Sequence, residues 1–315
     1  MSIGYAETSG SECVMDADSK RILFQSRGDV RLPMASTTKI VTAISVLEAV
    51  NDLERVVSIP KSAEGVEGSS VYLKSGEEYS VQDLLYGLML RSGNDCAVAL
   101  AVAVDGSVER FSSRMNETAK KAGAINSNFK TPHGLPKAGH YTTAVDLSLI
   151  TAYALQNETF KNIVSTKFYE PRGWANKNKM LRLYDGAIGV KTGYTKEAGR
   201  CLVSAVERDG LRLICSVLNC PTTYERSTQL LDDAFAAYQK VTLLSEGSTY
   251  SIEKEGKTIE GVVKEEFSYP LMKEEIEHIE IVTNPYTHPI KKEIIGQIQI
   301  SLFKRLLFCG FLYKL

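Results

Sequence analysis

The spacing of apolar residues changes several times along this chain, and each change predicts a different element. Residues 13–25 place strand-forming side chains around the polar turn Asp16–Lys20, which predicts a β-hairpin. Residues 36–50 are almost continuously apolar and rich in helix formers, so we expect a helix that is buried on nearly all sides. Residues 64–80 are rich in Gly and Ser and predict a loop, at whose end Ser80 can cap the next helix.

The following segments alternate between helical and strand spacing. The helix after the loop ends before Ser92–Asn94, and an alanine-rich helix is expected over about 95–104, which leaves Ser92–Asn94 as an exposed polar turn between helices. Residues 188–219 switch to strand spacing around the turn Asp209–Gly210, a strong hairpin signal, and a last helix is expected over about 224–238. Buried helices combined with an antiparallel sheet predict an α+β fold.

The composition changes again after Leu244. Short alternating runs rich in Ile, Val, Glu and Lys follow, separated by Gly and Pro turns, and the clearest strands are Ile279–Val282 and Ile294–Ile300. We therefore predict two domains: residues 1–245 with the mixed helices and sheet, and residues 246–315 as a small β-rich C-terminal domain.

Bulk composition narrows the function classes. The chain has 315 residues, of which 43% are hydrophobic and 24% charged, and its formal charge of -1 gives no electrostatic reason to bind nucleic acid. No stretch approaches the ~20 apolar residues of a membrane-spanning helix. Residues 1–6 lack the basic and apolar regions of a secretory signal, so the protein either is cytoplasmic or has had its signal removed.

Cysteine and histidine give no support for metal binding. The six cysteines form no C-x-x-C pair, and we interpret them as small buried hydrophobic residues whose disulfide state stays open. The four histidines show no helical metal spacing. We expect neither a metal nor a cofactor.

Ser36 and Lys39 provide the first candidate chemistry. On a helix the two side chains share a face, so Lys39 can accept the proton of the Ser36 hydroxyl if its amine is neutral. Burial against an apolar helix and a second cation, Lys191, would both lower the pKa of Lys39. Taken alone, such a pair is usually a helix-start hydroxyl and a surface lysine without a catalytic role.

Two further short motifs complete a possible acyl-transfer site. In Ser92-Gly93-Asn94, the hydroxyl can pass a proton to a leaving amine and the amide can hold a peptide carbonyl, although an isolated Ser-Gly-Asn is usually only a turn. In Lys191-Thr192-Gly193, a glycine inside a strand indicates that something approaches the backbone closely, and we expect an extended peptide.

The strand motif also has a plainer interpretation, as an edge-strand charge next to a bulge. In the catalytic interpretation Lys191 and Thr192 face a substrate carboxylate, and the backbone N–H groups of Tyr194 and Ser36 form an oxyanion hole. The joint occurrence of the three motifs in this order is what favours catalysis.

In this order, the three motifs resemble those of the penicillin-binding transpeptidase and serine β-lactamase superfamily, in particular the low-molecular-mass D-alanyl-D-alanine carboxypeptidases. The resemblance extends beyond the motifs and covers roughly residues 10–245. The further segments that are similar to sequences of this family are Pro33-Met34-Ala35, Ser69-Ser70-Val71-Tyr72-Leu73, Asp83-Leu84-Leu85-Tyr86-Gly87-Leu88-Met89, Pro132-His133-Gly134-Leu135 and Gly139-His140-Tyr141. The resemblance implies a β-lactamase/transpeptidase-like domain, with an antiparallel sheet, helices on both sides and a helical cluster.

The resemblance also implies a reaction. Ser36 attacks the bond between the two terminal D-alanines of a peptidoglycan stem peptide with Lys39 as base, D-alanine leaves with a proton passed through Ser92, and water hydrolyses the acyl-enzyme. β-Lactams acylate Ser36 as covalent inhibitors. Asn94, Lys191, Thr192, Gly193 and Tyr194 are the implied substrate-binding residues. Arg226 is our candidate for the further cation that the family places near the substrate carboxylate.

Two alternatives stay open. A β-lactamase shares the three motifs, but the most similar class needs a Glu-x-x-Leu-Asn loop, which is absent between Ser92 and Lys191; Glu158 stands in a different context. A penicillin-binding sensor or interaction module without turnover would carry the same motifs. Release of D-alanine from a short peptide separates these functions.

The C-terminal segment 302–315 departs from the resemblance. Many family members end in an amphipathic helix that lies on the membrane. Here an apolar run containing Gly310 favours a final strand of the small domain, with peripheral membrane contact as the alternative. An extracytoplasmic location in the cell envelope, at the outer face of the cytoplasmic membrane, follows only from where the implied substrate lies.

Overall fold

The computed structural model describes residues 10–254, 256–286 and 293–315. The chain divides into two compact units, which we treat separately. The first runs to Ala234 without residues 209–211, and the second contains Phe235–Leu315 together with Asp209–Leu211.

An antiparallel sheet forms the centre of the first unit. Its strand order is β2-β1-β9-β8-β7. The strands are β1 (Ser11–Asp16), β2 (Ile22–Ser26), β7 (Ala187–Thr195), β8 (Gly199–Arg208) and β9 (Leu211–Leu218). Because β7 comes last in this order, its outer edge is the side on which an extended peptide could add to the sheet.

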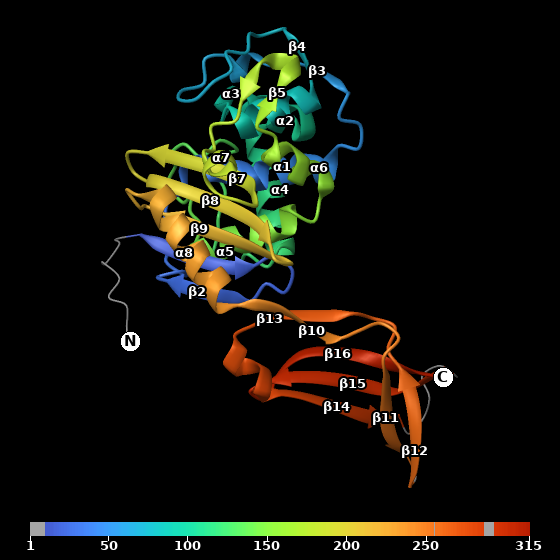
Figure 1. Cartoon of the computed structure of the whole chain (residues 1–315). Coiled ribbons are helices and arrows are strands. Elements are labelled where there is room, and N and C mark those ends of the chain that lie inside the picture. The colour runs from blue at the N-terminus through green and yellow to red at the C-terminus, as the bar shows by residue number, and fades with distance from the viewer. Residues whose placement is uncertain (1–9, 255, 287–292) are drawn as a thin grey trace. The chain divides into compact units, whose positions relative to one another are not determined.

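Helices cover both faces of this sheet, with α8 across one face and α5 behind the other (Figure 1). The helices are α1 (Lys39–Ala49), α2 (Val81–Leu90), α3 (Asn94–Asp105), α4 (Val108–Lys121), α5 (Ala144–Ala154), α6 (Glu158–Ser165), α7 (Met180–Leu183) and α8 (Thr223–Ala237). Residues Lys39–Val46 of α1 are all buried, as its apolar sequence predicts. The Ser80 side chain caps α2 by accepting from the Asp83 N–H at 3.0 Å, which confirms that prediction.

Short elements connect the helices. They are the 3-10 turns η1 (Ala35–Thr38), η2 (Lys61–Ala63) and η3 (Glu170–Arg172), and the strand pairs β3 (Val56–Ser58) with β4 (Glu78–Ser80) and β5 (Phe168–Tyr169) with β6 (Trp174–Ala175). The helix predicted from residue 36 therefore begins as a 3-10 turn and becomes α-helical at Lys39.

The second unit is built from strands. A sheet of order β11-β12-β16-β15-β14 accompanies the pair β10-β13. The elements are β10 (Gln239–Leu244), β11 (Thr249–Lys254), β12 (Lys257–Val262), β13 (Phe267–Leu271), η4 (Lys273–His278), β14 (Ile279–Pro285), β15 (Ile294–Leu302) and β16 (Arg305–Lys314). Buried Leu244, Ile252, Ile298 and Leu312 are part of its core.

Several predictions about the C-terminal part can be compared with the strands. Segment 302–315 contains the whole of β16 and is therefore mainly a strand, as we favoured over an amphipathic helix. The structural division after Ala234 lies earlier than the predicted boundary at 245/246, because β10 already pairs with β13. Five of the six cysteines are buried, whereas Cys309 is exposed and differs from the prediction.

Candidate active site

Ser36 lies in η1, immediately before α1. Ala35, which precedes it, has a φ of 49°, a left-handed conformation that costs about 1 kcal/mol for a residue with a Cβ. The turn is held by the Thr37 hydroxyl, which donates to the Met34 carbonyl at 2.7 Å. Residues three apart nearly eclipse in a 3-10 turn, and this brings Lys39 Nζ to 3.0 Å from Ser36 Oγ.

Lys39 is the most enclosed charged group of the site, with no exposed surface. Its Nζ lies 2.6 Å from Asn94 Oδ1 and 2.7 Å from the carbonyl oxygen of His133. Both oxygens can only accept hydrogen bonds, so they take two N–H groups of the amine. In a neutral amine the remaining lone pair then faces the Ser36 hydroxyl.

The surroundings favour that neutral form. Burial lowers the pKa of Lys39 well below its usual value, and the charge of Lys191 lowers it further. Lys191 is itself only 2% exposed, and burial followed by the charge of Lys177 lowers its pKa to about 7. The structure thus supplies both effects that the sequence led us to expect for Lys39.

Asn94 opens α3 and joins Lys39 to the loop before α2. Its Nδ2 donates to the Glu67 carbonyl at 2.6 Å, and its backbone N–H donates to the Ser69 carbonyl at 2.7 Å. The neighbouring Ser92 adopts a φ of 64°. Ser92 and Asn94 are 5% and 3% exposed, so the prediction of an exposed turn is wrong: α2, α3 and this loop enclose it.

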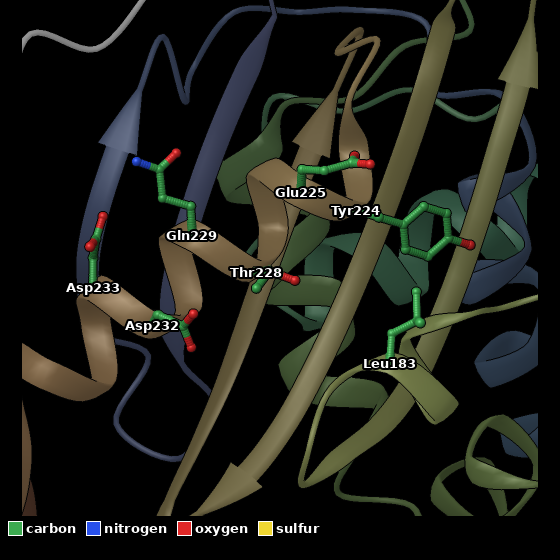
Figure 2. A pocket seen from close by; sticks show the side chains of 7 residues that line it. All are labelled: Leu183, Tyr224, Glu225, Thr228, Gln229, Asp232 and Asp233. Atoms are coloured by element: carbon green, nitrogen blue, oxygen red, sulfur yellow. The ribbon is translucent and has the colours of Figure 1, made fainter.

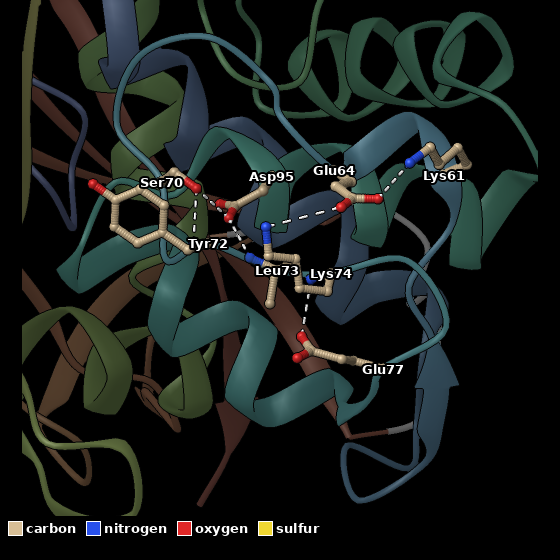
Figure 3. Close-up of polar contacts among 8 residues, drawn as sticks. All are labelled: Lys61, Glu64, Ser70, Tyr72, Leu73, Lys74, Glu77 and Asp95. Carbon is tan, nitrogen blue, oxygen red and sulfur yellow. Dashed lines mark hydrogen bonds and ion pairs between the residues drawn. The ribbon is translucent and has the colours of Figure 1, made fainter.

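Asp95 also holds the loop before α2. Its carboxylate accepts from the Ser70 hydroxyl at 2.5 Å and from the backbone N–H of Leu73 at 3.1 Å (Figure 3). It also accepts from the backbone N–H of Val71 at 3.0 Å. The loop therefore holds the exposed Tyr72 at a φ of 67°. The carboxylate is satisfied by donors that carry no full charge, so it anchors the loop beside Asn94.

Strand β7 packs its motif directly against the nucleophile turn. A Cβ on Gly193 would lie 3.0 Å from the Met34 carbonyl and 3.1 Å from the backbone nitrogen of Ser36. We expected a substrate peptide to require this glycine, and the structure shows that η1 itself is the close neighbour. Gly134 presses on the turn as well, since a Cβ there would lie 1.9 Å from the Ala35 carbonyl.

The three motifs meet at a cleft of about 360 Å³. Ser36, Ser92, Thr192, Gly193 and Tyr194 line it together with residues that the sequence analysis did not select: Ser69, Lys177, Lys179, Arg200, Cys201, Thr223 and Tyr224. Ser69 belongs to a sequence segment that resembles the family, so it could have been selected from the sequence. Nothing in the sequence indicated Lys177 and Lys179, because their positions depend on the path of residues 175–180 across the cleft.

A larger hollow of about 580 Å³ lies along α8 and shares Tyr224 with the cleft (Figure 2). Leu183 and the carboxylates of Glu225, Asp232 and Asp233 line it. It contains none of the motif residues. We therefore place the chemistry in the smaller cleft.

Arg226 does not reach the cleft. Its guanidinium donates to both carboxylate oxygens of buried Glu12, from Nε at 2.8 Å and from Nη2 at 2.7 Å. It is 8% exposed and is absent from the cleft lining. The structure thus corrects its predicted position, because the first turn of α8 directs this side chain to β1 instead of to the substrate site.

Within residues 10–254, 256–286 and 293–315 no group of three or more His, Cys, Asp or Glu side chains could hold a metal ion. No helix in the described part of the chain is long and apolar enough to cross a membrane.

An α+β fold with Ser36 in a cleft, buried Lys39 in contact with it and buried Lys191 on the adjoining strand β7 is typical of the penicillin-binding serine enzymes. The chain belongs to the D-alanyl-D-alanine carboxypeptidase family, whose family model matches residues 5–222.

Known relatives agree with this assignment. The chain is 33% identical over 258 residues to D-alanyl-D-alanine carboxypeptidase DacF of Bacillus subtilis, and 34% identical over 264 residues to DacC of Escherichia coli. These matches cover 78% and 76% of this chain but 66% and 64% of the relatives, so the matched part spans about two thirds of their length. Penicillin-binding protein 5 of Haemophilus influenzae superposes with a TM-score of 0.81 at 27% identity, covering 99% of this chain and 98% of that one.

Proposed function

We propose that this protein is a serine DD-carboxypeptidase that removes the terminal D-alanine from a peptide ending in D-Ala-D-Ala. The observation that carries the proposal is the environment of Lys39. Its amine gives two N–H groups to neutral carbonyl oxygens and lies 3.0 Å from Ser36 Oγ. A base of this kind activates a serine hydroxyl without histidine.

Acylation begins when Ser36 Oγ attacks the carbonyl carbon of the penultimate D-alanine and its proton passes to Lys39 Nζ. The backbone N–H groups of Ser36 and Tyr194 stabilise the developing oxyanion. The second N–H of Asn94 Nδ2 holds a carbonyl upstream in the substrate, while Asn94 Oδ1 keeps Lys39 in position.

Loss of D-alanine completes the first half-reaction. The peptide C–N bond breaks, and Ser92 passes to the leaving amine the proton that Lys39 took from Ser36. Water then attacks the Ser36 ester and gives one proton to the neutral Lys39. The ester C–Oγ bond breaks, Lys39 returns that proton to Ser36 Oγ, and the shortened peptide leaves with a new carboxyl group. Each turnover consumes one water and releases one D-alanine.

The terminal carboxylate of the substrate needs cationic partners. Lys191 and the hydroxyl of Thr192 lie on β7, and Lys177, Lys179 and Arg200 line the same cleft. Lys177 Nζ also donates to Ser69 Oγ at 3.5 Å, which places its charge near the Asn94 side of the cleft. We assign to these groups the task for which the sequence suggested Arg226.

The substrate class sets the biological setting of the proposal. A stem peptide of peptidoglycan ends in D-Ala-D-Ala, so the protein acts in the cell envelope, outside the cytoplasmic membrane. β-Lactams resemble that end and acylate Ser36. The β-lactamase alternative is disfavoured because Glu158, the acidic candidate between the motifs, stands at the start of α6 and does not line the cleft.

Two measurements test the function. Release of D-alanine from diacetyl-Lys-D-Ala-D-Ala should proceed catalytically, and intact mass should show one benzylpenicillin adduct that Ser36→Ala abolishes. Ser113→Ala, at an exposed serine of α4, is the matched control and should keep the adduct. A stable adduct without turnover would instead establish a sensor, and an adduct on Ser36→Ala would overturn the nucleophile.

A further inference from the structure

A third cavity, of about 400 Å³, borders the nucleophile turn from the loop side. Arg31 and Pro33 line it just ahead of η1, Lys137 and Tyr141 line it from the loop after Gly134, and Glu197 lines it from the β7–β8 turn. None of these groups has a part in the acyl transfer described above. The cavity therefore needs its own explanation.

The walls of this cavity are fixed by hydrogen bonds. Leu32 and Thr142 exchange backbone hydrogen bonds of 2.8 and 3.0 Å, and the Gly139 carbonyl accepts from Asn128 Nδ2 at 2.6 Å. His140 Nδ1 accepts from the Lys130 N–H at 2.9 Å, so Nε2 of the neutral ring carries the hydrogen and donates to Thr38 Oγ1 at 3.0 Å. This links the loop to the turn that carries Ser36.

The direction of β7 leads from the cleft to this cavity. Lys191 and Thr192 take the terminal carboxylate in the proposed reaction, and Gly193 lies opposite the nucleophile. The acyl side of an extended substrate must therefore run past Tyr194 toward the β7–β8 turn, where Glu197 lies. Glu197 lies three positions beyond Tyr194, about 10 Å at about 3.4 Å per residue, and a long side chain on either of the first two upstream residues can span that length.

The charges of the cavity indicate what it binds. Arg31 and Lys137 are exposed cations, against one carboxylate, Glu197. The Arg31 guanidinium is held over the Tyr141 ring at 5.0 Å and donates to Asn126 Oδ1 at 3.3 Å, which leaves further N–H donors of its planar fork for a ligand. A fixed guanidinium beside a lysine suits a carboxylate, and Glu197 suits an ammonium next to it.

We propose that this cavity is a subsite for a free carboxylate on the acyl side of the peptide substrate, carried by one of the residues upstream of D-Ala-D-Ala. The inference rests on the proposed DD-carboxypeptidase function and adds a preference for acidic upstream residues. Two sources supply such a carboxylate: the residue directly before D-Ala-D-Ala or the next one upstream.

Pairs of synthetic peptides distinguish these sources. In each pair a side-chain carboxylate is compared with its carboxamide, at the first upstream position in one pair and at the second in the other. One pair should show about a fivefold higher kcat/KM for the carboxylate, and the ratio should decrease with added salt, because the cations are exposed. Equal values in both pairs would overturn the proposal.

Variants then assign the preference to the cavity. The double variant Arg31→Gln/Lys137→Gln should reduce the carboxylate-to-carboxamide ratio to about one. Arg110→Gln/Lys120→Gln removes two exposed charges of α4 and should keep the ratio. A ratio that survives in the first double variant would place the recognition elsewhere and contradict the assignment.

The outcome for the subsite is separable from that for the function. Turnover of diacetyl-Lys-D-Ala-D-Ala, which has no upstream carboxylate, tests the function alone. If no peptide is hydrolysed, protection of Ser36 from benzylpenicillin by the same peptide pairs gives the carboxylate preference as a ratio of inhibition constants. The proposal then stands or falls on that ratio.

Discussion

Lys39 and Arg226 are both buried cationic side chains, in opposite chemical surroundings. The Arg226 guanidinium donates two hydrogen bonds to the Glu12 carboxylate, so each buried charge has an opposite charge in contact with it. The hydrogen-bond partners found for Lys39 are the neutral oxygens of Ser36, Asn94 and His133, and its nearby cation Lys191 repels it. A buried cation with a carboxylate in contact forms a structural ion pair, whereas a buried cation whose contacting partners are neutral can act as a base.

The comparison extends to an anion. Asp95 is 1% exposed and is satisfied by a hydroxyl and backbone N–H groups. Its contacts order a loop and perform no proton transfer. The type of partner, more than the depth of burial, therefore separates reactive from structural charges in this protein.

The largest expected effect comes from Lys39→Met. Loss of the general base should slow acylation by benzylpenicillin about 10²- to 10⁴-fold. The measurement is the second-order rate constant of adduct formation by intact mass, with Lys120→Met as a control that should leave it unchanged. A variant that keeps a tenth or more of the rate would break the contrast between Lys39 and Arg226.

The same variant has an opposite effect on stability. In the folded state the pKa of Lys39 is lowered, so the unfolded chain binds the extra proton between that pKa and 10.5, and folding pays a penalty at neutral pH. Lys39→Met removes this penalty, and its unfolding midpoint should equal or exceed that of the wild type near pH 7. The advantage should shrink as pH rises toward 10.5, as urea titrations at several pH values can check.

Arg226→Met should destabilise the protein by about 3–5 kcal/mol, because it leaves the Glu12 carboxylate buried without its guanidinium. Urea unfolding measures the loss, and Arg110→Met, at an exposed arginine, should stay within about 0.5 kcal/mol of the wild type. The double variant Glu12→Gln/Arg226→Met should recover part of the loss. A loss of unfolding free energy below about 1 kcal/mol would show that the ion pair between Arg226 and Glu12 does not stabilise the fold.

Lys191→Met sharpens the account of the pKa of Lys39. The charge of Lys191 lowers that pKa, so its removal should move the acidic limb of the acylation rate to higher pH. Benzylpenicillin acylation measured across pH gives the shift, and Lys179→Met controls for loss of a more exposed cleft cation. If the acidic limb of the acylation rate does not move, the charge of Lys191 does not contribute to the lowered pKa of Lys39.

The smallest effect is expected for Asp95→Asn. The amide retains an acceptor oxygen for part of the loop contacts, so the loss should be about 1–2 kcal/mol in urea unfolding. Proteolysis within residues 67–73 should become faster in the variant. If residues 67–73 are cleaved no faster in the variant, the negative charge of Asp95 is not needed to order this loop.

Local features of the site could be predicted from the sequence. The proximity of Ser36 and Lys39 follows from their spacing of three residues. The break between α2 and α3 follows from Ser92 and Gly93, which interrupt a sequence with helical spacing of apolar residues. The α+β class and the final strand followed from alternation. Such features depend on neighbours in the chain, which the sequence displays directly.

Features set by distant packing could not be predicted. Arg226 and Glu12 are 214 positions apart, and only the placement of α8 over β1 decides that they meet. The selection of the His133 carbonyl as an acceptor for Lys39 depends on how closely the loop at Gly134 approaches Ala35. Backbone oxygens carry no residue-specific signal, so sequence motifs do not reveal them.

The contacts of Gly134 and Gly193 with the nucleophile turn also limit how this turn can be reshaped by substitution. A Cβ at Gly134 would lie 1.9 Å from the Ala35 carbonyl oxygen and would displace the backbone, whereas a Cβ at Gly193 would lie 3.0 Å from the Met34 carbonyl oxygen and requires the turn to give by a few tenths of an ångström. Under the proposed acylation of Ser36 by β-lactams, a variant at Gly134 therefore has to move the nucleophile turn itself. A variant at Tyr194, whose side chain is 64% exposed, meets no such constraint.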